Sequence, residues 1–345
     1  MADLGKVDRT FFDEYVFPRL GADRADVALG PTHGVDFGLL DVNGTAVAIA
    51  TDPVSILPDL GFERAGRFAL DFVLADVAVS GLAPSHLAVS FTLPPEFEDE
   101  SFAAMWDAMH AEAEDLGVSI VTGHTARYAG CSLPWVGGAT ALAVGDPAEV
   151  IRPDGARAGD DVLVTKGPAV ETTGLLTTLF PDQIDLDPET LAAAQARLDE
   201  AACVRDAMTA AAAGGVHAMH DATECGLFGA FVEMATGAGV RLDVATDRIP
   251  FRPGVRETCD AIGIDPWRAT TGGTLVLAVD PDRTSAVVDA LEAEGTPVGV
   301  AGTVEAAGEK GEPGPGVVVD GEEISHPEVD PSWQAYEELS RASER

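Results

Sequence analysis

Hydrophobic and polar positions follow two different periods in the first half of the chain. Alternation with period two and short apolar runs predict strands over 41–51, 85–93, 117–123 and 134–145. Helical periodicity covers 62–80, which Gly81 follows, and 99–116, which Gly117 follows. Asn43-Gly44 predicts a two-residue hairpin turn that leads into the first long strand. Because strands and helices intermix, we expect a mixed α/β fold.

A second α/β unit follows residues 146–160, a segment rich in proline, glycine and charge that predicts a domain boundary. Its expected elements are strands over 161–167, 240–245, 273–279 and 297–304, helices over 168–180 and 188–213, and a strand and helix across 216–237. Residues 305–316 predict a loop, and at most one short charged helix follows Pro331. We therefore expect domains over 1–150 and 151–330 and a charged tail over 331–345.

The charge balance is strongly acidic, with 58 Asp and Glu against 21 Lys and Arg and a net charge of −37. A nucleic-acid partner is not expected, because binding a phosphate backbone requires clustered basic residues. The carboxylates are spread along the whole chain, which argues against an acidic tail. The remaining interpretation is a solvated acidic surface whose self-repulsion is screened by salt. It predicts a protein from the salt-rich cytoplasm of a halophilic archaeon.

The chain shows no signal-peptide pattern and no apolar run of membrane-spanning length, so we expect no membrane association. Its four cysteines lack the paired spacing of zinc or redox sites, which predicts reduced thiols. The glycine-rich signatures of P-loop and dinucleotide-binding proteins and the nucleophile elbow of hydrolases are absent from the sequence. Dispersed carboxylates and glycines must therefore carry any chemistry.

Asp76 is the best physical clue, since the apolar stripe Ala65, Ala69, Phe72 continues into it on the core-facing side of the 62–80 helix. A lone buried carboxylate is unfavourable unless it is paired or bound to a cation. A hydrogen bond to a helix start or an arginine would also explain it. We favour a metal-binding role, because other carboxylates stand at equivalent positions.

These other carboxylates are Asp52 and Asp36. Asp52 is expected at the end of the strand AIATDPV, and Asp36 lies in the turn HGVDFGLL. Either one alone is more often a turn or cap residue. Together with Asp76, the two would suit Mg²⁺, which prefers oxygen ligands and usually keeps a phosphate partner.

Two further segments predict substrate contacts. Asp221 and Thr223 lie in HDATECGL, directly before a predicted helix, where caps and free backbone N–H groups can bind an anion. Plain helix capping explains both residues equally well. Gly272-Gly273, before the strand TLVLAV, indicates either a close-approach loop or a turn. In GVSIVTGHT, a strand that is expected to end at Gly123 presents His124, which could be a metal ligand, a proton carrier or a turn residue.

Seven motifs in order, GVDFGLL, ATDPV, ADVAVSGLAP, IVTGHT, TKGPAVETTGLL, DATECGL and TTGGTLVLAV, resemble the aminoimidazole ribonucleotide (AIR) synthase superfamily over residues 30–304. The likeness is greatest to its hydrogenase-maturation branch and the archaeal paralogues of that branch. The resemblance implies an N-terminal domain that forms a shared β-barrel in a homodimer and a C-terminal α/β domain. It also implies ATP bound in a cleft near the interface of the two domains, with Mg²⁺ held by aspartates of the N-terminal motifs.

The motif positions imply a set of site residues. Asp36, Asp52 and Asp76 fall at the metal-binding positions, while Asp221, Thr223 and His124 fall in the catalytic part of the cleft. The nucleotide and phosphate side would further include Gly123, Thr125, Lys166, Gly226 and Gly272.

Three departures from the pattern bear on function. Val35 replaces a possible metal carboxylate, His124 replaces a family aspartate, and the chain ends without the cysteine that carries the carbamoyl group in the hydrogenase-maturation protein. Imidazole is a poorer Mg²⁺ ligand than carboxylate. Cys225 is a conceivable substitute nucleophile, although a packing role is more typical.

The sequence thus predicts an ATP- and Mg²⁺-dependent enzyme with kinase- or ligase-like phosphotransfer, which phosphorylates or dehydrates a small-molecule or amide-type substrate. A catalytically reduced, ATP-binding dimeric partner protein is the alternative from another class. True AIR synthase or thiamine-phosphate kinase activity is a third.

Overall fold

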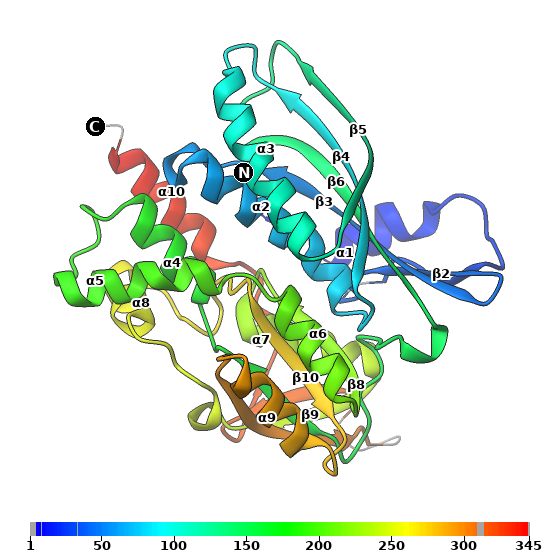
Figure 1. The fold of residues 1–345 in the computed structure, drawn as a ribbon. Coiled ribbons are helices and arrows are strands. Elements are labelled where there is room, and N and C mark those ends of the chain that lie inside the picture. Colours follow the sequence, from blue (N-terminus) through cyan, green and yellow to red (C-terminus); the bar gives the residue numbers. More distant parts are fainter. Residues whose placement is uncertain (1–4, 8, 33, 309–313, 344–345) are drawn as a thin grey trace. The chain divides into compact units, whose positions relative to one another are not determined.

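The computed structural model describes residues 5–7, 9–32, 34–308 and 314–343. The chain divides into two compact units (Figure 1). The N-terminal unit comprises residues 25–30 and 36–150, and the C-terminal unit comprises residues 1–24, 31–35 and 151–345. The described residues before Ala25 thus group with the second half of the sequence, which the hydrophobic pattern does not indicate. In the described part of the chain, no helix is both long and apolar enough to cross a membrane.

The N-terminal unit is built on a six-stranded sheet in the order β1-β2-β3-β6-β4-β5, in which only β4 and β5 are parallel. The strands are β1 (Val27–Leu29), β2 (Gly38–Val42), β3 (Thr45–Ser55), β4 (Pro84–Leu93), β5 (Ser119–Arg127) and β6 (Trp135–Gly145). Helices α2 (Phe62–Ala78) and α3 (Asp99–Asp115) lie side by side next to this sheet (Figure 1).

Alternation along β3 fixes the face of the sheet that the helices cover. Ala46, Ala48 and Ala50 are buried while their neighbours are more exposed, as a period of two requires. The two helices approach each other closely at Gly66, where a Cβ would lie 2.5 Å from the carbonyl oxygen of Met105. A side chain at this position would force α2 and α3 apart.

The C-terminal unit contains a seven-stranded sheet in the order β13-β12-β9-β11-β7-β10-β8. Its strands are β7 (Asp161–Thr165), β8 (Val216–Ala222), β9 (Val240–Val244), β10 (Thr274–Val279), β11 (Val298–Ala306), β12 (Gly316–Val319) and β13 (Glu322–Ile324). Strand β10 lies between β7 and β8 and is antiparallel to both. The ends of β7 and β8 and the start of β10 therefore meet at one edge of the sheet.

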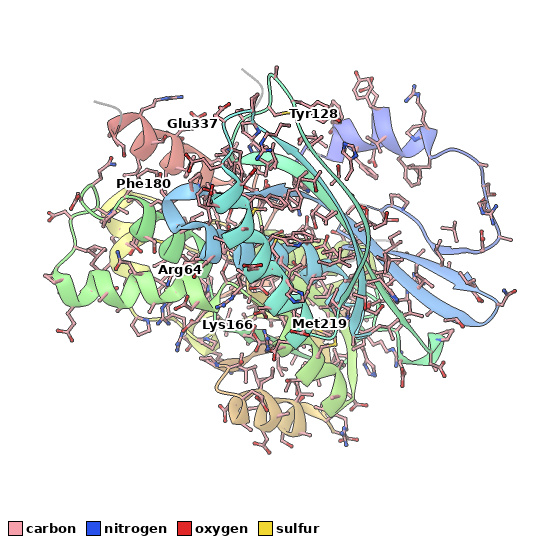
Figure 2. All side chains as sticks on the ribbon, turned by 45° about the horizontal axis from the view of Figure 1, so that its top comes forward. Arg64, Tyr128, Lys166, Phe180, Met219 and Glu337 are labelled. Carbon is pink, nitrogen blue, oxygen red and sulfur yellow. The ribbon has the colours of Figure 1, made fainter. Side chains whose placement is uncertain are left out.

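Helices surround this second sheet and complete its core. They are α4 (Val170–Leu179), α5 (Pro188–Gln195), α6 (Val204–Ala213), α7 (Gly226–Ala238), α8 (Val255–Ile262), α9 (Thr284–Ala293) and α10 (Pro331–Ser343), and α1 (Arg9–Phe11) is a single turn. Leu227, Phe231 and Met234 of α7 are buried against the strands. Helix α10 packs Ala335 and Tyr336 onto Leu176 and Phe180 at the α4 end, where Figure 2 labels Phe180 and, on α10, Glu337.

Most predicted elements are confirmed, including the hairpin at Asn43-Gly44 between β2 and β3 and the single helix after Pro331. Three short strands (β1, β12, β13) and three helices (α1, α8, α9) were not predicted. Helix α8 has the sequence VRETCDAI, in which Val255, Cys259 and Ile262 follow a helical spacing, so the pattern could have predicted it. Part of the expected loop over 305–316 lies outside the described residues, and β11 extends into its start.

Candidate functional site

Three loops of the C-terminal unit meet at the shared edge of β7, β10 and β8. The backbone N–H of Thr271, before β10, donates to the carbonyl of Thr223, after β8, over 3.2 Å. The Thr271 hydroxyl accepts the N–H of Val170 at 3.1 Å and donates to the carbonyl of Gly167 at 3.0 Å. One threonine side chain thus joins the loop after β7 to the loop before β10, and its backbone joins the loop after β8.

The loops hold an unusual concentration of left-handed backbone. Lys166, Ala169 and Cys225 have φ values of 54°, 52° and 64°, a conformation that non-glycine residues seldom adopt. Gly167 has φ 103°, and a Cβ there would lie 1.8 Å from the carbonyl oxygen of Pro250. Strained backbone of this kind persists where the surrounding structure fixes it, and it is typical of ligand-binding and active sites.

The carboxyl group of Glu171 lies at this junction. Glu171 stands in the first turn of α4, is partly buried, and accepts the N–H of Gly272 through one oxygen over 3.1 Å. Removal of the carboxyl from water raises its pKa to about 8, and the nearby charges of Asp330 and Glu224 act in the same direction, while the Gly272 N–H opposes them. Glu171 is therefore mostly protonated at neutral pH.

Asp330 connects the C-terminal segment to the same loops. Its carboxylate accepts the N–H of Cys225 and the hydroxyl of Thr270, each at 2.7 Å, and the N–H of Ser332, also at 2.7 Å. These three bonds occupy both oxygens of Asp330 and hold the segment before α10 against the loops after β8 and before β10.

The N-terminal segment reaches the turn after β8. The backbone N–H of Lys6 donates to the Glu224 carboxylate at 2.8 Å, and the Lys6 ammonium donates to the Thr223 hydroxyl at 3.2 Å. The predicted site residue Thr223 is therefore covered by a cation from a remote part of the sequence.

A histidine–carboxylate–histidine group lies beside this turn. His220 Nε2 is 3.0 Å from one Glu233 oxygen and His326 Nε2 is 3.4 Å from the other. The Glu233 hydrogen bond raises the pKa of His326, and bonds from both histidines keep the pKa of Glu233 well below its usual range although burial opposes this. Asp221, the neighbour of His220, is buried in β8 opposite Leu275.

The thiol of Cys225 is protonated at neutral pH. Burial raises its pKa to about 12, and the charges of Asp330 and Glu233 add to this. The reactive form of cysteine is the thiolate, so the structure favours the packing role over a nucleophilic one. Gly226 follows with φ 61°, and a Cβ at this position would lie 2.7 Å from the carbonyl oxygen of Trp267.

Lys166, labelled in Figure 2, is buried in the C-terminal unit. Its buried ammonium donates to the carbonyls of Glu200, Ala202 and Gly273 and lies 2.6 Å from the carboxylate of Asp206. An ammonium has three hydrogens, so these partners saturate it.

The N-terminal unit carries the three predicted metal ligands separately. Asp36 precedes β2, Asp52 lies within β3, and Asp76 is near the end of α2, each partly buried. The oxygens of these three described residues do not all lie within 4.8 Å of one another. The prediction that Asp52 closes its strand is wrong, because β3 continues to Ser55 and Asp52 pairs with Ala139 of β6.

Asp76 lies at the margin of the core-facing side of α2. Ala65 and Ala69 are buried as predicted, whereas Phe72 and Asp76 are only partly buried. The buried face of the helix is wider than the predicted stripe and includes Asp71.

Gly123, His124 and Thr125 lie inside β5, so the prediction that the strand ends at Gly123 is wrong. These residues pair with β4, and the strand continues to Arg127. A Cβ at Gly123 would lie 2.5 Å from the carbonyl oxygen of Val89, which accounts for the glycine. His124 is exposed, stacks on Tyr128 and bonds to its hydroxyl at 3.0 Å.

Sequence reasoning missed Glu171, Asp330, Lys6, Glu233 and His326. Glu171 lies within the motif TKGPAVETTGLL, where a carboxylate one residue into an apolar helix was the available signal. Asp330 and His326 follow the last predicted strand, and no local pattern distinguishes them from other loop residues.

Family models match both units of the chain. The model described as AIR synthase related protein, N-terminal domain, matches residues 34–148, and the corresponding C-terminal domain model matches residues 157–312. The chain belongs to the AIR synthase related family, as its ordered motifs predict.

Named relatives and a solved structure agree with this assignment. A carbamoyl dehydratase HypE of Rhizobium leguminosarum bv. viciae is 27% identical over 265 residues, covering 75% of this chain and 73% of the relative. A putative hydrogenase expression/formation protein of Methanocaldococcus jannaschii is 22% identical over 291 residues, covering 83% and 84%. The solved structure of hydrogenase maturation protein HypE in complex with ATP is similar with a TM-score of 0.67 at 22% identity, covering 95% of this chain and 97% of that one. The AIR synthase-like fold is thereby confirmed.

Proposed function

We propose that the protein is a cytoplasmic, ATP-dependent enzyme that phosphorylates or dehydrates a small molecule, with an amide-type group as the favoured acceptor. One observation carries this proposal: the loops after β7 and β8 and before β10, which contain three of the seven family motifs, are bonded together beside Glu171. Support comes from the relative named carbamoyl dehydratase and from the solved HypE complex that contains ATP.

Mg²⁺ is the metal that the donor set fits. The candidates Asp36, Asp52 and Asp76 offer hard carboxylate oxygens, and they do not form a preformed cage. Mg²⁺ is commonly bound by one or two carboxylates together with nucleotide phosphates, so this arrangement suits an ion that arrives with ATP. When bound, the ion would neutralise phosphate charge. The aspartates would hold the ion and, through it, the nucleotide phosphates.

We also propose a homodimer. Strand β5 is an edge strand of its sheet and carries exposed Val121, and exposed Tyr128 follows it directly. An exposed apolar sheet edge is typically covered by another chain.

The test is ATP turnover in molar KCl with Mg²⁺, alone and with a protein-free extract of small-molecule metabolites, together with ATP binding by calorimetry. We expect ATP binding and an extract-stimulated release of ADP. Failure to bind ATP would overturn the proposal.

A catalytically reduced, ATP-binding partner protein is the second candidate. Val35 and His124 remove two possible metal carboxylates, and His124 bonds to Tyr128 on an exposed strand. Two results together would favour this candidate: tight ATP binding without turnover under any of these conditions, and recovery of a partner protein in a pull-down with this chain.

A further inference from the structure

Glu171 differs from the other carboxylates at the loop junction in how its oxygens are used. Asp330 accepts three hydrogen bonds, and Glu224 accepts the N–H of Lys6. Glu171 accepts one bond, from Gly272, and its second oxygen has no hydrogen-bond partner among the described residues. The carboxyl is thus oriented by the backbone on one side and available on the other.

We propose that Glu171 is the general base of this site and that it takes a proton from a neutral acceptor group, an alcohol or a primary amide. The assignment rests on the proposed function. It also restricts the substrate class, because the carboxylates of Glu224 and Asp330 face the same junction and disfavour an anionic acceptor such as a phosphate monoester.

The proton and bond balance of the step is simple. The acceptor oxygen forms a bond to the γ-phosphorus of ATP while the bond from that phosphorus to the bridging oxygen breaks, and ADP leaves with the electron pair. An alcohol loses its O–H proton to the Glu171 carboxylate. A primary amide loses an N–H proton to Glu171 instead. Its former carbonyl carbon then has a C=N bond and a single bond to the phosphorylated oxygen.

The groups around Glu171 suit this role. The Gly272 N–H comes from the loop before β10, Glu224 from the turn after β8, and Asp330 from the segment before α10. Together with burial, the two carboxylates raise the pKa of Glu171 to about 8, which makes it a stronger base than an ordinary carboxylate and places it near the working pH.

The experiment compares wild type with Glu171→Gln, using ATP hydrolysis, in which water is the simplest neutral acceptor. Gln keeps an oxygen for the Gly272 N–H but cannot accept a proton. In the wild type we expect turnover to rise about tenfold per pH unit below the Glu171 pKa and to level off above it. In Glu171→Gln we expect at least a ~100-fold loss, no such rise with pH, and an unchanged ATP dissociation constant.

Two further variants control the result. Glu189→Gln alters the second residue of α5, the exposed counterpart of Glu171 in α4, and should leave turnover unchanged. Glu171→Asp keeps a carboxylate and should recover part of the pH-dependent turnover, which a purely structural role does not predict.

The outcomes separate the two proposals. Wild-type turnover that survives in Glu171→Gln with its pH dependence overturns the assignment of the base and leaves the proposed function standing. A wild type that binds ATP but has no turnover overturns the general base together with the enzyme function. Equal melting temperatures of wild type and Glu171→Gln would show that a loss of turnover is not a loss of folding.

Discussion

The ammonium nitrogen of Lys166 and a carboxylate oxygen of Asp206 lie 2.6 Å apart, and both side chains are buried. The hydroxyl of Thr296 donates to the other oxygen of Asp206. The carbonyl oxygens of Glu200, Ala202 and Gly273 accept the remaining bonds of the ammonium. The pair therefore ties the loop after β7 to α6 and to the start of β10, at the edge where the candidate site lies.

Lys166→Met should destabilise the protein by about 3–5 kcal/mol, because it leaves the Asp206 charge buried without a cation. Chemical denaturation in molar KCl measures this. Arg341→Met, which breaks the exposed pair with Glu337 on α10, is the control and should cost less than about 0.5 kcal/mol. If Lys166→Met keeps its stability and instead loses ATP affinity, the lysine binds nucleotide, as the family resemblance implies.

His326→Gln should lower stability in a pH-dependent way. The pKa of His326 is raised above that of the unfolded chain by Glu233, whose own pKa is lowered, so Glu233 stays ionised across this range. The stabilisation by His326 is fully present below the unfolded imidazole pKa of about 6.5 and is lost as pH rises through the raised folded value.

Melting curves at slightly acidic and clearly alkaline pH check this expectation. The variant should melt below wild type at acidic pH and close to it at alkaline pH. His110→Gln, at an exposed position on α3, should show no such difference between the two conditions. A deficit that is the same at both pH values would mean that His326 acts by packing alone.

The sequence predicts the elements of the two sheets well and the candidate site only in part, and the reason is physical. Alternation in β3 is a local property, since each side chain reports the face it occupies. The Glu171–Gly272 contact joins residues 101 positions apart and exists only because β10 pairs with β7. Nothing near Glu171 in the sequence encodes that pairing. The Asp330–Cys225 bond, 105 positions apart, is equally non-local.

Asp76→Asn should weaken Mg-ATP binding at least ~10-fold, because a neutral amide is a poorer Mg²⁺ ligand than a carboxylate. Its stability should change little, since Asp76 lies at the margin of the buried face of α2. Calorimetric titration with and without Mg²⁺ measures the affinity, and Asp107→Asn at an exposed position of α3 is the matched control. A collapse of stability with intact nucleotide affinity would favour the alternative in which Asp76 pairs with a helix start or an arginine.

The net charge of −37 predicts that stability rises steeply with salt. Repulsion among the surface carboxylates opposes the compact state, and the screening length falls from about 10 Å at 0.1 M to about 3 Å at 1 M salt. We expect the melting temperature to climb across this range of KCl. The triple variant Asp182→Asn, Asp185→Asn, Glu189→Gln removes three exposed negative charges. It should be more stable than wild type by roughly 1 kcal/mol in low salt and equal to it in molar salt. A gap that persists unchanged in molar KCl would show that the carboxylates act through something other than screened repulsion.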